Sequence, residues 1–233
     1  MTSPNKEFDM EIFIIMAIGY AATFVAFRGL KLAFNSPAMK DAIISEDPER
    51  GVDGPTLRHS AKLNSAVSVG FMFGCGFLFS DFLLYSGDVA LWRIALEIVM
   101  VVIIYDFIYY GVHRYPFHEW KILRAVHAVH HKTRHPRAVD SLLLHPLETC
   151  LGLGAFLVSI ALVGGVSVPS FTVLFIGYTV LNVVNHAGLN FQRFPLRTMG
   201  WLAVKHDKHH RRDLAGNYAF LTTIPDTLFG TAE

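Results

Sequence analysis

The chain has 233 residues, of which 52% are hydrophobic and only 17% are charged, and its formal net charge is +1. Soluble globular proteins carry about 25% charged residues, so this composition argues against a fully water-soluble protein and favours one that has a lipid bilayer as part of its solvent. The near-neutral charge argues against a nucleic-acid partner, because neutralising phosphates requires a dense basic face. The two cysteines, Cys75 and Cys150, lie in apolar stretches, which argues against a disulfide framework.

Five apolar segments approach the length of about 20 residues that a membrane-spanning helix needs. The third also carries two carboxylates, Glu97 and Asp106. The last two are separated by a short stretch and could instead form a shallow re-entrant hairpin. The sequence therefore predicts an all-α fold, a membrane helical bundle with four to five spans. The five segments cover residues 12–27, 65–85, 91–112, 147–163 and 171–184.

Basic residues gather on one side of this predicted topology. With five crossings, residues 28–63, 113–145 and 191–233 fall on the same side, and each of these segments contains six Lys or Arg. Together they hold 18 of the 20 basic residues of the chain. Because loops rich in Lys and Arg remain in the cytoplasm, we expect this side to be cytoplasmic, with the N-terminus outside and the C-terminus inside.

The chain has 12 histidines, and eleven of them lie between positions 113 and 210, at or beyond the cytoplasmic ends of the predicted spans. The pattern His-x-x-His-His occurs twice, in "VHAVHH" and in "HDKHH". Its i, i+3, i+4 spacing would place all three side chains on one face of a helix. One copy could be a solvated polar face, but two copies favour metal binding. The six residues are His127, His130, His131, His206, His209 and His210.

Further histidines stand at the ends of the predicted spans. His113 and His118 in "HRYPFH" are five residues apart, which does not give one α-helical face. Pro116 disfavours helical geometry at the residue before it, so we expect a break there that brings His118 back beside His113. His145 opens "HPLE" before the fourth span, and His186 lies in "NHAGLN" after the fifth.

These histidines are too many for a single metal ion. A structural zinc takes four protein ligands and a catalytic one takes three with a water, and neutral imidazole suits iron, zinc, copper or nickel. Two ions with four or five nitrogens each would use them all. The ten candidate ligands are His113, His118, His127, His130, His131, His145, His186, His206, His209 and His210.

Three polar residues are candidates to orient these ligands through hydrogen bonds. Asp106 lies two helical turns before His113, Glu148 lies one turn after His145, and Asn190 follows the fifth span. Each has a structural alternative. Asp106 could hold the bundle together by a hydrogen bond, although a carboxylate within a span is a functional candidate by default. Glu148 could stabilise a helix N-terminus. Asn190 could hold a metal-bound water or cap a helix end.

The motifs and their order resemble those of the fatty acid hydroxylase/sterol desaturase superfamily of integral-membrane di-iron oxygenases. They are "DFIYYGVHRYPFH", "VHAVHH", "HPLE", "NHAGLN", "HDKHHRRDLAGNYAF" and "DTLFGT", over roughly residues 100–231. The resemblance implies a cytoplasmic His-rich helical cap in which the ten histidines hold two iron ions. It also implies a catalytic domain at residues 91–233, preceded by membrane segments and a cytoplasmic loop at residues 1–90. Asn190 departs from the family pattern, because it stands where a second histidine would be.

The resemblance further implies a reaction in which dioxygen and two electrons hydroxylate a fatty acyl, sterol or related lipid. Desaturation is the alternative outcome. The electrons would come from a separate NAD(P)H-linked carrier and reductase, and zinc could replace iron in purified protein. Breaking an unactivated C–H bond needs a cofactor, because side chains lack the oxidising power.

Two classes of membrane protein other than an oxygenase fit the histidines less well. A metal transporter would place them along its spans, whereas here they lie beyond the span ends. A b-type cytochrome needs two axial ligands per haem inside the bundle, which leaves most of them unexplained.

Overall fold

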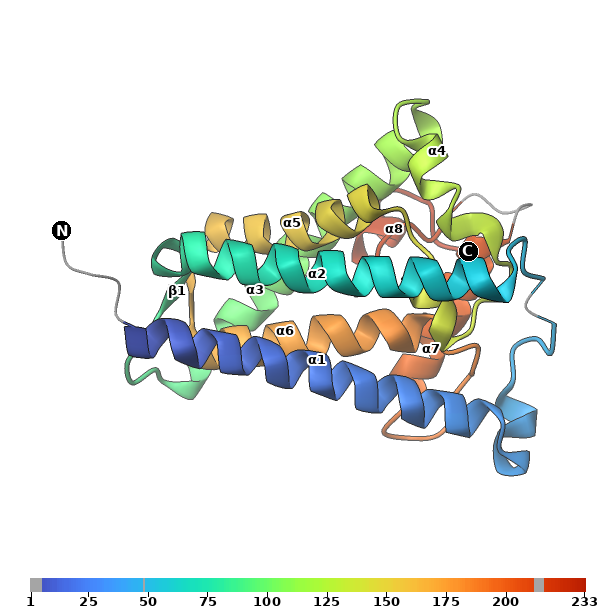
Figure 1. The fold of residues 1–233 in the computed structure, drawn as a ribbon, viewed down its shortest axis with the longest axis horizontal. Coiled ribbons are helices and arrows are strands. Elements are labelled where there is room, and N and C mark those ends of the chain that lie inside the picture. The colour runs from blue at the N-terminus through green and yellow to red at the C-terminus, as the bar shows by residue number, and fades with distance from the viewer. Residues whose placement is uncertain (1–5, 48, 212–215) are drawn as a thin grey trace.

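The computed structural model describes residues 6–47, 49–211 and 216–233, and it is built almost entirely of helices (Figure 1). Two short strands, β1 (Leu84–Tyr85) and β2 (Val166–Ser167), pair in parallel at one end of the molecule. The predicted all-α class is therefore confirmed. Five long helices form the body: α1 (Lys6–Phe34), α2 (Gly54–Leu83), α3 (Leu91–Val112), α5 (Pro146–Val163) and α6 (Val168–Asn185).

Shorter helices gather at the other end of the body, away from β1 (Figure 1). There α3 continues directly into a π-helix, and three 3-10 helices connect the longer elements. The short elements are α4 (Arg124–His127), α7 (Arg197–His210), α8 (Ile224–Leu228), the π-helix His113–Glu119 and the 3-10 helices Pro37–Ala42, His130–Lys132 and Ala138–Leu142.

Local sequence signals set the starts of the long helices. Asp53 accepts a hydrogen bond from the backbone N–H of Thr56 at 2.8 Å and so caps α2. Ser167 caps α6 through the N–H of Ser170 at 3.4 Å. Side-chain oxygens at this position satisfy backbone donors that lack a partner within the helix. Proline stands in the first turn of α2, α5 and α6. It favours a helix start, because its φ is already helical and the N–H that it lacks would have no partner within the helix.

Four helices are long and apolar enough to cross a membrane: Met10–Phe34, Gly54–Leu83, Pro146–Val163 and Val168–Asn185. Their outer faces expose large apolar side chains, such as Phe24 at 64%, Phe77 at 68% and Leu162 at 64%. Contiguous exposed apolar surface of this kind indicates contact with lipid. The predicted multi-span bundle is thus confirmed, with four candidate spans among the described residues. The 22-residue helix α3, the third predicted span, is not among these four.

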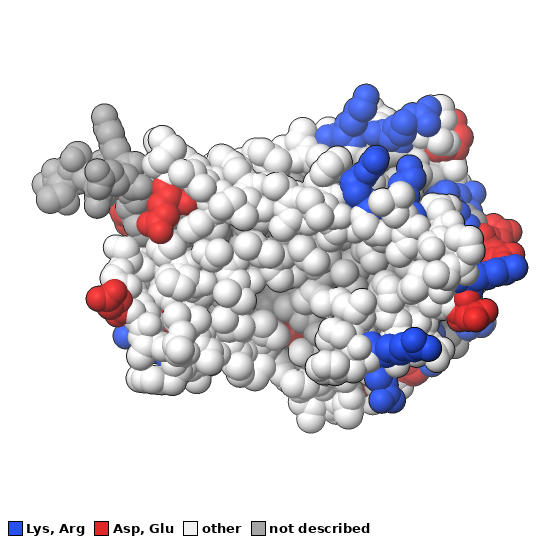
Figure 2. Space-filling model, turned by 90° about the horizontal axis from the view of Figure 1, so that it is seen from below, with Lys and Arg blue, Asp and Glu red and all other residues white. Residues whose placement is uncertain are grey.

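Charged side chains avoid the middle of the molecule on the face shown in Figure 2. Lys and Arg gather at the end where α4 and α7 lie, and acidic side chains dominate near the N-terminus. A broad band separates the two ends, and the charged atoms seen in its middle are acidic ones inside a hollow. This distribution fits a molecule whose middle lies in hydrocarbon.

Close packing fixes the helices around α3 and α6. Tyr105 of α3, Phe156 of α5 and Phe175 of α6 are almost fully buried. Gly19 of α1 lies against the Phe175 ring, since a Cβ at this position would be 2.6 Å from two ring carbons. The long helices therefore hold a defined arrangement, and the short helices build the candidate site at one end of it.

Candidate metal centre

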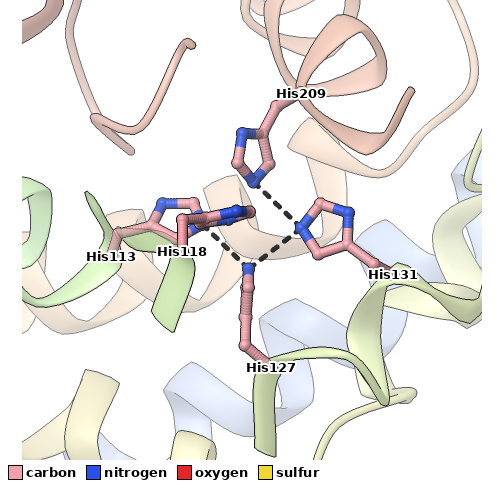
Figure 3. A group of neighbouring side chains, drawn as sticks. All are labelled: His113, His118, His127, His131 and His209. Atoms are coloured by element: carbon pink, nitrogen blue, oxygen red, sulfur yellow. Dashed lines mark hydrogen bonds between the residues drawn. The ribbon is translucent and has the colours of Figure 1, made fainter. Parts of the chain in front are cut away.

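Nine histidines converge among the short helices and form two neighbouring groups. Within each group, one nitrogen of every ring lies within 4.8 Å of those of the others. The rings of His131 and His210, one from each group, have centroids 4.8 Å apart. The five-histidine group, drawn in Figure 3, consists of His113, His118, His127, His131 and His209. The four-histidine group consists of His130, His186, His206 and His210.

Each His-x-x-His-His motif contributes to both groups. The i and i+4 histidines of a motif enter one group, and the i+3 histidine enters the other. In the first motif, His130 enters the four-histidine group and the other two enter the five-histidine group. In the second motif, His209 enters the five-histidine group and the other two enter the four-histidine group. An α-helix turns by about 100° per residue, so positions i+3 and i+4 point in clearly different directions. All three rings of the second motif nevertheless lie on one side of α7, as predicted, with centroids at most 6.1 Å apart. In the first motif α4 has already ended at His127, so the 3-10 turn supplies the other two rings.

A π-helical turn brings His113 and His118 together, with ring centroids 5.2 Å apart. The backbone N–H of Trp120 donates to the carbonyl of Tyr115, five residues earlier, at 2.6 Å. Because π-helices bond at a spacing of five residues, side chains five apart lie much closer to one face than they would in an α-helix. The predicted break at Pro116 is wrong: the chain remains helical, and the wider turn aligns the two histidines.

Hydrogen bonds that Nδ1–H donates fix the orientation of six of the rings. Five rings donate Nδ1–H to backbone carbonyls, and His127 donates to Oε1 of Glu148 at 2.8 Å. A neutral imidazole carries one proton, so in these rings Nε2 is left with a free lone pair. The carbonyl pairs are His113–Tyr218 at 2.6 Å, His130–Leu143 at 3.2 Å, His186–Asn182 at 2.7 Å, His209–Gly216 at 2.8 Å and His210–Thr133 at 2.9 Å.

The free Nε2 atoms face one another at distances that suit a cation between them. Nε2 of His113 lies 3.1 Å from that of His127, and Nε2 of His130 lies 3.1 Å from that of His210. In these pairs both nitrogens carry lone pairs, so neutral rings cannot hydrogen-bond there. The buried Nε2 of His118 has no hydrogen-bond partner in the described chain. A metal ion that prefers imidazole, such as iron or zinc, fits this donor set.

Burial keeps these imidazoles uncharged at neutral pH. Desolvation lowers the pKa of His118 to about 4 and the pKa of His130 to about 3. The same cause, reinforced by the neighbouring His118, lowers the pKa of His209 well below its ordinary value. Metal ions bind the deprotonated nitrogen, so the rings are in the required form without further proton loss.

Asp106 forms hydrogen bonds with a backbone segment of the site. It is buried, and its carboxylate accepts the backbone N–H groups of residues 220, 221 and 222, each at 2.8 Å. In the described part of the chain its hydrogen bonds go to this segment and to no histidine ring. The segment follows Tyr218, whose carbonyl orients His113. Asp106 therefore supports one ligand indirectly, through the backbone.

A second buried carboxylate that holds the same segment was not predicted. Asp226 accepts the N–H groups of Tyr218 at 2.7 Å and Ala219 at 3.0 Å, and it pairs with Lys205 at 3.1 Å. Lys205 in turn donates to the Ala219 carbonyl at 2.6 Å. The signal in the sequence is the acidic residue of "DTLFGT", which stands in an otherwise apolar stretch.

Two further predicted site residues, like Asp106 and Glu148, lie outside both groups. His145 is exposed, and its Nδ1 accepts the N–H of Leu147 at 3.1 Å, so it caps α5. Asn190 is half-buried, and its backbone N–H donates to the Ala42 carbonyl at 2.7 Å. The structure thus brings nine of the ten predicted ligands together and leaves His145 apart.

A cavity of about 520 Å³ lies among α1, α2, α3, α5 and α6, beside the four-histidine group. His130 and Glu148 form part of its wall at the histidine end. Phe24 of α1 and Val69 of α2 also line it, and both are exposed on the outer, apolar surface. Small-molecule pockets measure about 300–1,000 Å³, so the cavity can hold a lipid that arrives from the bilayer.

Comparisons with known proteins agree with this site. Residues 98–231 match the family model described as fatty acid hydroxylase. Methylsterol monooxygenase 1 from Rattus norvegicus is 29% identical over 135 residues, which is 55% of this chain and 44% of that protein. Very-long-chain aldehyde decarbonylase GL1-11 from Oryza sativa subsp. indica is 32% identical over 143 residues, 58% of this chain and 52% of that protein.

Methylsterol monooxygenase 2-2 from Arabidopsis thaliana is 31% identical over 152 residues, 60% of this chain and 54% of that protein. The chain thus spans about half the length of the curated relatives it matches. No solved structure matches it.

Proposed function

Because this chain belongs to the fatty acid hydroxylase family, we propose that it is a membrane-bound oxygenase that uses two iron ions, dioxygen and two electrons to hydroxylate a lipid. The observation that carries the proposal is the pair of buried groups of five and four histidines. The adjoining cavity supports a lipid substrate, because its walls reach from the apolar surface to His130. Relatives named for methylsterols and for a very-long-chain aldehyde favour a sterol, a fatty acyl compound or a related lipid.

In this proposal the five-histidine group would hold one iron ion and the four-histidine group the other. The two ions would supply the oxidation of a C–H bond by dioxygen, which side chains cannot perform. The carbonyls and Glu148 keep six of the Nε2 atoms turned inward by holding the Nδ1 proton of those rings. The cavity wall would place one carbon of the lipid beside the histidines. Residues 91–233 would form the catalytic domain, and α1 and α2 from residues 1–90 would complete the cavity.

We also propose that the histidine end faces the cytoplasm, where a separate NAD(P)H-linked carrier and reductase would deliver the electrons. The basic side chains at this end support that orientation through the positive-inside rule (Figure 2). A cysteine introduced at the exposed Lys121 tests it. It should react with a membrane-impermeant thiol reagent in inside-out vesicles and stay unlabelled in right-side-out vesicles.

The first test is the metal content of the purified, iron-supplied protein, measured by mass spectrometry. We expect about two iron ions per chain, and a His209→Ala variant should lose at least the ion of the five-histidine group. His59→Ala is the matched control, because His59 is exposed on α2 and belongs to neither group. Folded protein that binds neither iron nor zinc would contradict the proposal. Products formed under isotopically labelled dioxygen then separate hydroxylation, which incorporates the label, from desaturation, which does not.

A further inference from the structure

Glu148 has one carboxylate oxygen that lacks a partner. Its Oε1 accepts the Nδ1–H of His127 at 2.8 Å, whereas Oε2 is buried and has no hydrogen-bond partner in the described chain. The residue is only 6% exposed, and it belongs to neither histidine group. A buried acceptor without a donor is costly and is rare in native proteins. Something that the chain does not supply should therefore donate to Oε2.

Glu148 lies on the cavity wall, and several other polar side chains of that wall have partners within the chain. The Tyr20 hydroxyl lies 2.9 Å from Oγ of Ser68, and the Thr149 hydroxyl donates to Oδ1 of Asn64 at 2.7 Å. Among the described residues, Oε2 of Glu148 is the buried atom of this wall that has no partner. A purely hydrocarbon ligand would close the cavity over this oxygen and leave it without a donor.

We infer that the substrate of the proposed oxygenase carries a hydrogen-bond donor, a hydroxyl or an amide N–H, which binds Oε2 of Glu148; this inference rests on the proposed function. The donor would lie next to the metal centre, because the other oxygen of the same carboxylate holds His127 and because His130 shares the cavity wall. The carbon that is oxidised therefore lies close to the donor group. Glu148 would position the substrate, and the remaining, mostly apolar walls would accept its hydrocarbon part.

Binding of matched lipid pairs to zinc-loaded protein in detergent tests this inference without turnover. The hydroxyl pairs are hexadecanol with its methyl ether and cholesterol with its methyl ether. The amide pair is N-methylhexadecanamide with methyl hexadecanoate. A buried acceptor without a partner costs free energy, and a donor removes that cost. We therefore expect the donor-bearing member of at least one pair to bind about tenfold more tightly or better, a difference of about 1.4 kcal/mol or more. The pair that shows the preference identifies the donor as a hydroxyl or an amide.

Glu148→Gln separates this role from simple packing. The glutamine carbonyl can still accept from His127, but its NH2 group now points where Oε2 was, so the preference should disappear or turn toward the ether or ester. Gly154→Ala on the same helix is the control. Its new Cβ would meet only the Phe71 ring, at 3.9 Å, and Gly154 does not line the cavity. This control should keep the preference of the unaltered protein.

Equal binding of both members of every pair by the unaltered protein would overturn the inference. A preference that Glu148→Gln leaves intact, or no binding of any probe by folded protein, would do the same. Two iron ions and oxygen-dependent lipid turnover, found together with equal binding, would leave the proposed function standing and remove only this inference. Donor-selective binding that depends on Glu148, in protein without metal-dependent turnover, would support the donor site and remove the proposed function.

Discussion

The carboxylate of Asp106 receives only donors, namely three backbone N–H groups of residues 220–222 and the Thr222 hydroxyl. In Asp106→Asn, one of its oxygens becomes an NH2 group that faces a donor. We expect the free energy of unfolding to fall by about 1–3 kcal/mol, the cost of a buried polar group without a partner. Thermal melts of detergent-solubilised protein measure the change. Asp81→Asn, at the exposed end of α2, should melt as the unaltered protein does, and equal melts for both variants would contradict the anchoring role.

Helices α1 and α6 pack along one another and approach most closely at Gly19, where only glycine fits. A Cβ on Gly19 would lie 2.6 Å from two ring carbons of Phe175, and that ring is fully buried and cannot move aside. We expect Gly19→Ala to lower the stability by about 1–3 kcal/mol through overpacking.

Gly29→Ala on the same helix has no neighbour within 4 Å. It should therefore stabilise the helix by up to about 1 kcal/mol. Thermal melts should show shifts of opposite sign for the two variants, and shifts of the same sign would contradict the close approach.

The helices that carry the histidines show where pattern reasoning at this scale fails. The spacing of "VHAVHH" and "HDKHH" correctly indicates helical segments, but it cannot show that α4 ends at His127 and that a 3-10 turn begins at His130. Likewise, Pro116 suggests a break, because local rules describe an α-helix and not a π-helix. The geometry of these short elements is set by tertiary contacts of the rings, which no single segment of sequence contains.

Across the whole molecule, the membrane bundle and the family could be predicted because they depend on composition and on short motifs. The superfamily resemblance of these motifs is confirmed by the family match over residues 98–231. The partners of Asp106 could not be predicted, since they lie more than 100 residues away in the sequence. The part that α1 and α2 play in lining the cavity could not be predicted either. In the sequence, Tyr20, Phe24 and Asn64 resemble ordinary membrane-helix residues, and only the fold brings them together around the cavity.

The many buried neutral histidines make the metal-free protein sensitive to acid. The pKa of His118 is about 4 and that of His130 about 3 in the folded protein, below the value of about 6.5 for a solvated imidazole. Below about pH 6.5 the unfolded chain therefore binds more protons than the folded one. Stability should be full above that pH and should fall as the pH drops toward 4, by about 1.4 kcal/mol per ring and pH unit.

Thermal melts of chelator-treated protein between about pH 7.5 and pH 4.5 measure this dependence. Replacing one buried ring by a group that does not titrate, as in His118→Gln, should make the fall less steep. His59→Gln should leave it unchanged, because His59 is exposed on α2 and belongs to neither histidine group. A melting temperature that stays constant over this range would show that the rings are already protonated or accessible to water in the folded protein, and the lone-pair argument for a bound cation would then fail with it.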